Sequence, residues 1–143
     1  MCPTYAMLDT GANCSAVTED ICETIGAEIS NLDIKLAVFG HESTKSRAVT
    51  SVSVFSLKQD FHINLKNALV GDYISRESEK PPRAEELKKF KHLKNVTLND
   101  LDDLSVGVLL DAKYAWAFMT GEIKNGEISE PMAVRSKFGW ALV

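Results

Sequence analysis

The residues best suited to chemistry are Asp9, Thr10 and Gly11, which follow a short apolar run. Residues 5–8 have the composition of a buried strand, so the carboxylate of Asp9 would lie where that strand ends. Gly11 permits a tight turn, and Thr10 supplies a hydroxyl group. Backbone N–H groups of such a turn could hold the carboxylate as a general acid or base. The same tripeptide is also a common structural turn, so alone it does not establish a catalytic site.

Other residues with reactive or metal-binding side chains show weaker patterns. Cys14 could act as a thiol nucleophile, but no histidine lies near it in sequence, which favours a small core or cleft residue. The histidines His41, His62 and His92 have no metal-ligand spacing. The acidic run 99–103 lacks the glycine and the terminal glutamate of a calcium loop. We therefore expect neither a metal ion nor another cofactor.

Length, charge and cysteine content limit the class of protein. The 143 residues suit a single domain, 1–143, and the content of 45% hydrophobic and 25% charged residues is that of a globular chain. The net charge of −4 argues against nucleic acid as a partner. No apolar run is long enough to cross a membrane, and no signal-peptide pattern is present. Three cysteines without paired spacing fit a reducing, intracellular compartment such as the cytoplasm.

The elements expected to position the turn are mostly strands. A short helix is expected at 18–25, because Thr18 is a good N-cap and Gly26 a good C-terminal stop. A second helix is expected at 113–120, and the polar residues 40–45 would form the mobile tip of a long hairpin. Further strands are expected from hydrophobic runs or alternation at 34–39, 48–57, 61–65, 68–70, 105–110, 132–135 and 139–143.

Residues 75–104 form a charged insertion. After two prolines, apolar residues recur at a helical spacing, namely Leu87, Phe90 and Leu93. Glu85 precedes Lys89 by four positions, which would place opposite charges on one helix face. We therefore expect an exposed amphipathic helix. Its basic residues could form a nucleic-acid or partner surface, although the interleaved glutamates favour a solvated face.

Several motifs occur along the chain in a characteristic order. They are LDTGANCS at 8–15, KHLKNVTL at 91–98, VLL at 108–110, YAW at 114–116, MTGEI at 119–123 and KFGW at 137–140. In these motifs the chain resembles the retropepsins, the retroviral-type aspartic proteases, and above all the protease domain of BEL/Pao-type retrotransposon polyproteins. The resemblance covers nearly the whole chain. It implies a mainly β, closed domain with a short helix after the Asp-Thr-Gly turn, a charged helical insertion and a C-terminal helix.

The resemblance also implies an activity. It makes Asp9, Thr10 and Gly11 the catalytic residues of an aspartic endopeptidase that cuts peptides or a retroelement polyprotein. Because the chain has one Asp-Thr-Gly, the second carboxylate must come from a second copy, so a homodimer is required. The hairpin tip would be a flap over the substrate, and 139–143 would lie in the subunit interface. The implied substrate-binding residues are Ala12, Asn13, Cys14, Phe39, Gly40 and His41.

Three features depart from the family pattern. Asp111 stands where the family has glycine, Lys113 stands where it has aspartate, and fewer residues precede Asp9. A buried Asp111 charge is costly unless it is paired, and Lys113 could pair with it or face solvent. These departures motivate an alternative, a catalytically inactive, domesticated domain that dimerises or holds a peptide.

Overall fold

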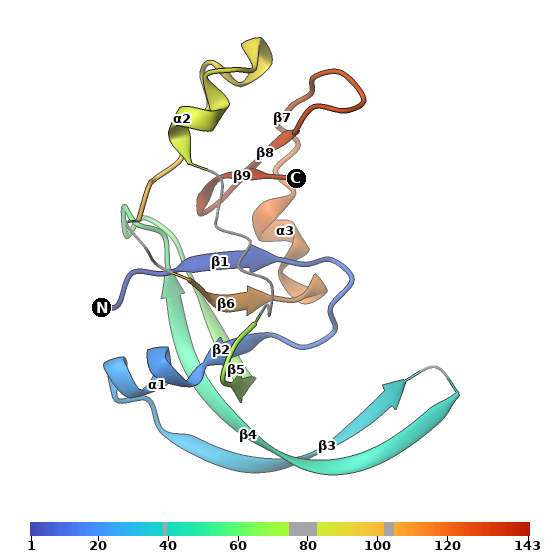
Figure 1. Cartoon of the computed structure of the whole chain (residues 1–143). Coiled ribbons are helices and arrows are strands. Elements are labelled where there is room, and N and C mark those ends of the chain that lie inside the picture. The colour runs from blue at the N-terminus through green and yellow to red at the C-terminus, as the bar shows by residue number, and fades with distance from the viewer. Residues whose placement is uncertain (39, 75–82, 102–104) are drawn as a thin grey trace.

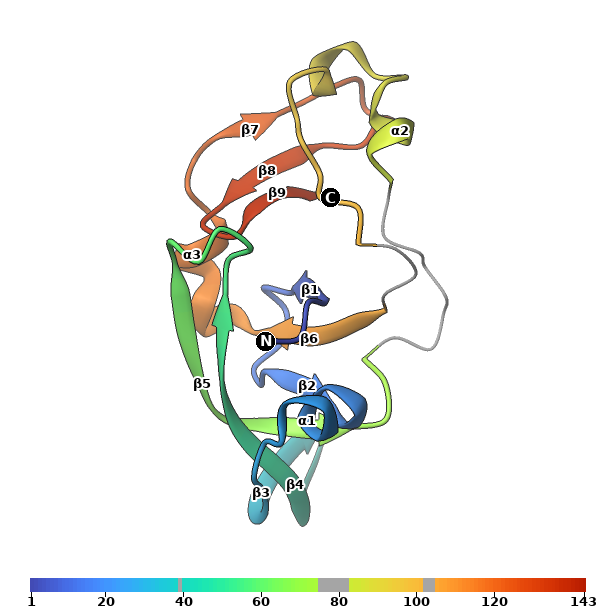
Figure 2. The ribbon, with the colours of Figure 1, turned by 90° about the vertical axis from the view of Figure 1, so that its left-hand side faces the viewer.

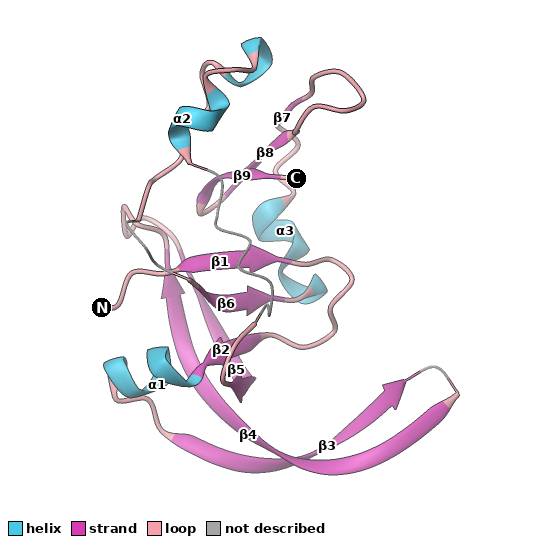
Figure 3. Cartoon of the chain, viewed as in Figure 1, coloured by secondary structure: helices cyan, strands magenta, loops and turns pink. Residues whose placement is uncertain are grey.

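Within the described residues, two β-sheets form the framework of the protein, and three short α-helices flank them (Figures 1 and 3). The computed structural model describes residues 1–38, 40–74, 83–101 and 105–143. The first sheet has six strands: β1 (Tyr5–Leu8), β2 (Ala16–Thr18), β3 (Ile29–Val38), β4 (His41–Phe55), β5 (His62–Gly71) and β6 (Val106–Leu110). The second has three: β7 (Ile123–Lys124), β8 (Ala133–Ser136) and β9 (Gly139–Leu142). The expected mainly β class is confirmed.

The six-stranded sheet, in the order β1-β6-β2-β5-β4-β3, carries the main core. β1 pairs with β6 in parallel, and β2 lies between β6 and β5. Along β5, Ile63 and Leu65 are buried while their neighbours are exposed, which is the period of two of a half-buried strand. The segments 61–65 and 68–70, expected as separate strands, form one strand. Asn67 takes a left-handed φ of 53° there, where the pairing with β4 shifts register.

The helix α1 (Glu19–Ile25) begins and ends where the sequence predicts. Thr18 has the extended backbone of an N-cap, although its hydroxyl makes no capping hydrogen bond. Gly26 is left-handed, with a φ of 65°, and its N–H donates to the carbonyl of Glu23. α1 lies so close to β6 that a Cβ at Gly107 would be 2.8 Å from Ile21 Cγ1. The glycine therefore allows this contact.

The hairpin of β3 and β4 is longer and more regular than the sequence suggests. Residues 41–45, expected as part of a polar tip, belong to β4, and Val38 pairs with His41. Gly40 has a φ of 75°, which glycine adopts without strain. Phe39 lies outside the described residues. Polar residues can form the outer part of these strands. Most of the described side chains there are exposed on both faces of the hairpin, so the pairing needs no apolar face packed on a core.

Residues 75–82 and 102–104 of the insertion lie outside the described residues, and its described part is not one exposed helix. The helix α2 (Ala84–Leu87) stops after one turn, and a 3₁₀ turn, η1 (Lys91–Leu93), follows an extended Phe90. Leu87 and Leu93 are buried in a second core cluster with Ala133 of β8. Packing against this sheet thus overrides the helical spacing. Figure 2 shows this segment and the second sheet at one end of the molecule and the β3–β4 hairpin at the other.

The C-terminal helix is shorter than the expected 113–120. It consists of a 3₁₀ turn, η2 (Ala112–Tyr114), and α3 (Ala115–Phe118). The carbonyl of Ala117 accepts a hydrogen bond from the N–H of Lys137, so the β8–β9 turn takes an acceptor that a longer helix would use.

Among the described residues, no helix has the length and apolar character needed to cross a membrane.

Candidate functional site

Asp9 lies directly after β1 and is fixed to the neighbouring strand. Leu8 and Leu110 are register partners in the parallel pair of β1 and β6. The N–H of Asp9 then donates to the carbonyl of Leu110 over 3.0 Å. Because Leu110 is completely buried, the start of the Asp9 turn is anchored in the core. The prediction of a carboxylate at a strand end is confirmed, but the prediction that this strand is buried is wrong, because β1 lies at the edge of the sheet and is only half-buried.

The turn after Asp9 holds one oxygen of its carboxylate. The N–H of Gly11 donates to Asp9 Oδ1 over 2.8 Å, and the N–H of Ala12 donates to the Asp9 carbonyl over 3.3 Å. A Cβ at position 11 would lie 3.2 Å from Oδ1, so glycine lets the backbone approach closely. Asp9 is half-buried and Thr10 is exposed. No other hydrogen bond reaches this carboxylate from the described part of the chain, which leaves Oδ2 available to a water or a second carboxyl group.

A second acid, Asp111, lies directly after β6 and is 1% exposed. Its Oδ1 accepts from the N–H of Lys113 over 2.8 Å, and its Oδ2 accepts from Ser15 Oγ over 3.2 Å. Ser15 Oγ in turn accepts from the N–H of Asp111. Asp111 is therefore the N-cap of η2. Lys113 Nζ is 3.8 Å from Oδ2, but that side chain is 74% exposed, so the backbone and Ser15 are the closer partners.

Ser15 is a supporting residue of the candidate site that the sequence did not predict. It joins the Asp9 loop to the turn after β6, and the N–H of Ala112 adds a second link by donating to the carbonyl of Ala12 over 3.0 Å. The partners Ser15 and Asp111 are 96 positions apart, so no local spacing could reveal them. The two loops thus form one hydrogen-bonded unit beneath Asp9.

The expected substrate-binding residues fall into two groups. Ala12, Asn13 and Cys14 continue the loop after Asp9 and precede β2. Gly40 and His41 are at the tip of the β3–β4 hairpin, which Figure 1 shows extending beyond the sheet on the side of the Asp9 loop. In the described residues, no hydrogen bond connects the tip to that loop. Phe39 and the side chain of His41 are outside what the structure describes.

The cysteines and histidines form no metal-binding group among the residues described. No three Cys, His, Asp or Glu side chains gather there as ligands would. His92 instead contacts the carbonyl of Pro131 over 2.9 Å and Glu130 over 3.5 Å. Burial, assisted by Asp20, raises the pKa of the Cys22 thiol, so this thiol stays protonated.

Comparison with known proteins does not assign the chain to a family. No family model, no curated protein and no solved structure matches it. Its function must therefore be argued from the Asp9 loop, from the turn that supports the loop, and from the motifs in the sequence.

Proposed function

We propose that this chain is an aspartic endopeptidase of the retropepsin type that works as a homodimer. One observation carries the proposal: the carboxylate of Asp9 directly follows the half-buried edge strand β1, with Oδ1 held by the N–H of Gly11. The loop around it is fixed by Ser15, Asp111 and the β6 backbone. Such support keeps a reacting carboxylate in one position, which catalysis by positioned acids requires.

The chemistry needs two carboxyl groups that share one proton, because two adjacent negative charges are unfavourable. The ionised group acts as a base on a water molecule, which attacks the scissile carbonyl, and the protonated group donates to the carbonyl oxygen. The two groups titrate as a pair. In this chain Gly11 would hold the carboxylate, while the exposed Thr10 would make hydrogen bonds to the second copy beneath the catalytic pair.

The second carboxyl group is expected from another copy of the chain. Asp111 follows β6 as Asp9 follows β1, but hydrogen bonds from Ser15 and Lys113 already occupy its two oxygens. Two Asp9 residues can meet only across a two-fold axis. β1 and β9 are edge strands of their sheets. Such strands carry backbone groups that could pair with a second copy.

The β3–β4 hairpin is suited to act as the flap. Residues 41–48 of β4 pair with β3 and not with β5, and most of the described side chains in this part of the hairpin are exposed. A two-stranded ribbon of this kind is only marginally stable alone and can move as a unit. Closing over a peptide would bury it and exclude bulk water, while the attacking water molecule stays in the site.

The test is cleavage of a degenerate library of unstructured peptides across a range of pH. We expect wild-type protein to cleave with an acidic optimum, because one carboxyl group must hold a proton. Asp9→Asn should lower kcat/KM by about 10²–10⁴-fold. Asp20→Asn, an equal change of charge at an exposed position, should leave it unchanged. Sedimentation should show that the active species is a dimer.

Two outcomes would contradict the enzyme proposal. One is that wild type and Asp9→Asn are equally inactive at every pH although both are folded dimers. The other is that the folded chain stays a monomer at every concentration tested, whether or not it cleaves peptides. A dimer that binds peptide without cleaving it would instead support the alternative, a catalytically inactive binding domain.

A further inference from the structure

The segment that covers the second sheet carries a concentration of positive charge. Lys88, Lys89, Lys91 and Lys94 lie within seven residues, and no acidic residue occurs between Glu86 and Asp100. All four lysines are exposed. We call them the lysine surface. The whole chain has a net charge of −4, so this surface is basic within an acidic protein.

The glutamate pairing expected from the sequence is absent from this surface. α2 ends at Leu87, so Glu85 and Lys89 do not lie on successive turns of one helix. In the described residues, no ion pair involves any of the four lysines. The reason for expecting a neutral, solvated face therefore does not hold.

The neighbouring acids are directed to other partners. Glu86 Oε2 accepts from the N–H of Arg83 over 3.0 Å. Asp100 Oδ1 accepts from the N–H of Ala84 over 3.1 Å, and Glu130 lies 3.5 Å from His92 Nδ1. Each of these three carboxylates thus has a partner outside the lysine surface, and among the described residues none of them forms an ion pair with its lysines.

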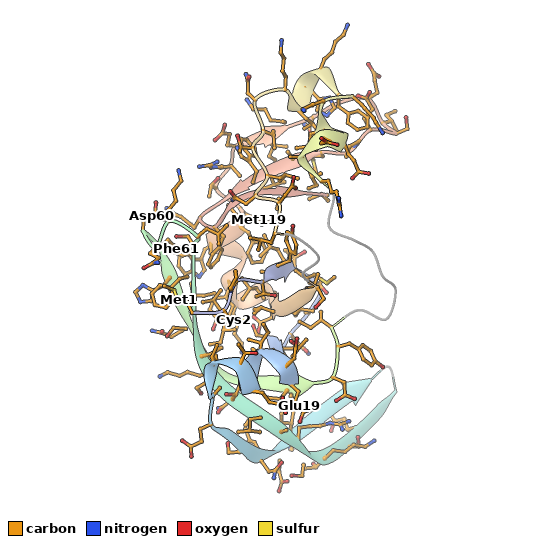
Figure 4. The ribbon with its side chains drawn as sticks, turned by 60° about the vertical axis from the view of Figure 1, so that its left-hand side comes forward. Met1, Cys2, Glu19, Asp60, Phe61 and Met119 are labelled. Atoms are coloured by element: carbon orange, nitrogen blue, oxygen red, sulfur yellow. The ribbon has the colours of Figure 1, made fainter. Side chains whose placement is uncertain are left out.

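The backbone under the lysine surface is fixed. Leu87 and Leu93 are 3% and 1% exposed, and they pack in the second core cluster against Ala133. His92 Nε2 bonds to the carbonyl of Pro131 in the loop before β8. Figure 4 shows nitrogen-tipped side chains that extend from this end of the molecule. A ligand would therefore meet charges on an ordered support and would not have to order the backbone.

We infer that the lysine surface binds the phosphate backbone of a nucleic acid without reading its sequence. Exposed lysines supply point charges, which is what phosphate contacts require. A protein partner would need apolar anchors, and protein interfaces are depleted in lysine. Here the larger apolar residues of the segment are buried or, for Phe90 and Leu98, half-buried. This leaves no exposed aromatic platform for stacking on bases in the described part of the segment, so contacts to phosphates are favoured.

The test is fluorescence anisotropy of the full chain with a labelled single-stranded RNA of about 20 nucleotides. Its counterpart is a DNA duplex of about 20 base pairs, and salt is varied from about 25 to 200 mM. We expect weak binding. The logarithm of the association constant should fall linearly with the logarithm of the salt concentration, with a slope of about −3 for four phosphate contacts. Changing all four lysines of the surface to glutamine should lower the affinity at least about tenfold and flatten the slope.

The matched control removes the same charge elsewhere. Lys35→Gln, Lys45→Gln, Lys58→Gln and Lys66→Gln together change four exposed lysines outside the surface. This variant should keep most of the affinity, and circular dichroism should show that both variants are folded.

The inference is overturned if wild type does not bind at the lowest salt, or if both variants lose affinity equally. It is also overturned if polyglutamate competes as well as RNA, which would indicate an acidic protein partner. Asp9→Asn should bind RNA normally, so this inference and the proposed protease activity can fail separately.

Discussion

At the scale of single residues, Asp111 shows how the chain holds an acid in its core. A carboxyl group at 1% exposure is costly unless donors meet both of its oxygens. Ser15 and the N–H of Lys113 meet them, and Ser15 also accepts from the N–H of Asp111. The buried acid is thus accommodated as the N-cap of η2. Asp111 supports the Asp9 loop, and its two oxygens are already occupied.

This role of Asp111 predicts a measurable loss of stability. Asp111→Ala should lower the free energy of unfolding by about 1–3 kcal/mol, because it removes an N-cap and leaves buried donors unpaired. Ser15→Ala should also destabilise, and the double variant should cost less than the sum, since the two side chains share one contact. Asp33→Ala, on an exposed strand, is the control. Urea denaturation measures the free energy of unfolding of each variant and of wild type. If Asp111→Ala unfolds at the same urea concentration as wild type, this role of Asp111 is contradicted.

At the scale of elements, the sequence predicted those whose signals are local. The helix at 18–25, the strand before Asp9 and the buried strand at 105–110 follow from caps and apolar runs. The turn of Asp9 and Gly11 was predicted for the same reason. The end of α2 after one turn was not predicted, because it is determined by the burial of Leu93 against the second sheet. The link from Ser15 to Asp111 was missed because it depends on the pairing of distant strands.

The packing of α1 against β6 gives a prediction at this scale. A Cβ at Gly107 would lie 2.5 Å from Thr4 Oγ1 and 2.8 Å from Ile21 Cγ1. Gly107→Ala should therefore destabilise the protein by about 1–3 kcal/mol through overpacking. Gly71→Ala is the matched control, because a methyl group added there would have nothing within 4 Å and the φ of Gly71 is not positive. Thermal unfolding compares them, and equal melting temperatures would show that α1 shifts without cost.

At the scale of the whole molecule, the two core clusters belong to different sheets and are joined by the β8–β9 turn. The N–H of Lys137 donates to the carbonyl of Ala117. The ring of Phe138 lies 5.0 Å from that of Phe61, at the edge of the main core. The Asp9 loop is attached to the main core, whereas the lysine surface is attached to the second cluster. Damage to the second cluster can therefore reach Asp9 through this junction, or through Tyr5 of β1, whose hydroxyl bonds to the backbone of Leu101.

Leu93→Ala tests that separation. Leu93 is 1% exposed in the second cluster, so its truncation should cost about 2–5 kcal/mol. Hydrogen exchange should quicken at β8 and β9 more than at β5 and β6, because local opening follows the weakened contacts. RNA affinity should fall as well, since the support of the lysine surface loosens. Leu57→Ala, at a side chain that is 52% exposed, should change stability by no more than about 0.5 kcal/mol. Equal loss of protection in both sheets would show instead that the two clusters unfold as a single cooperative unit.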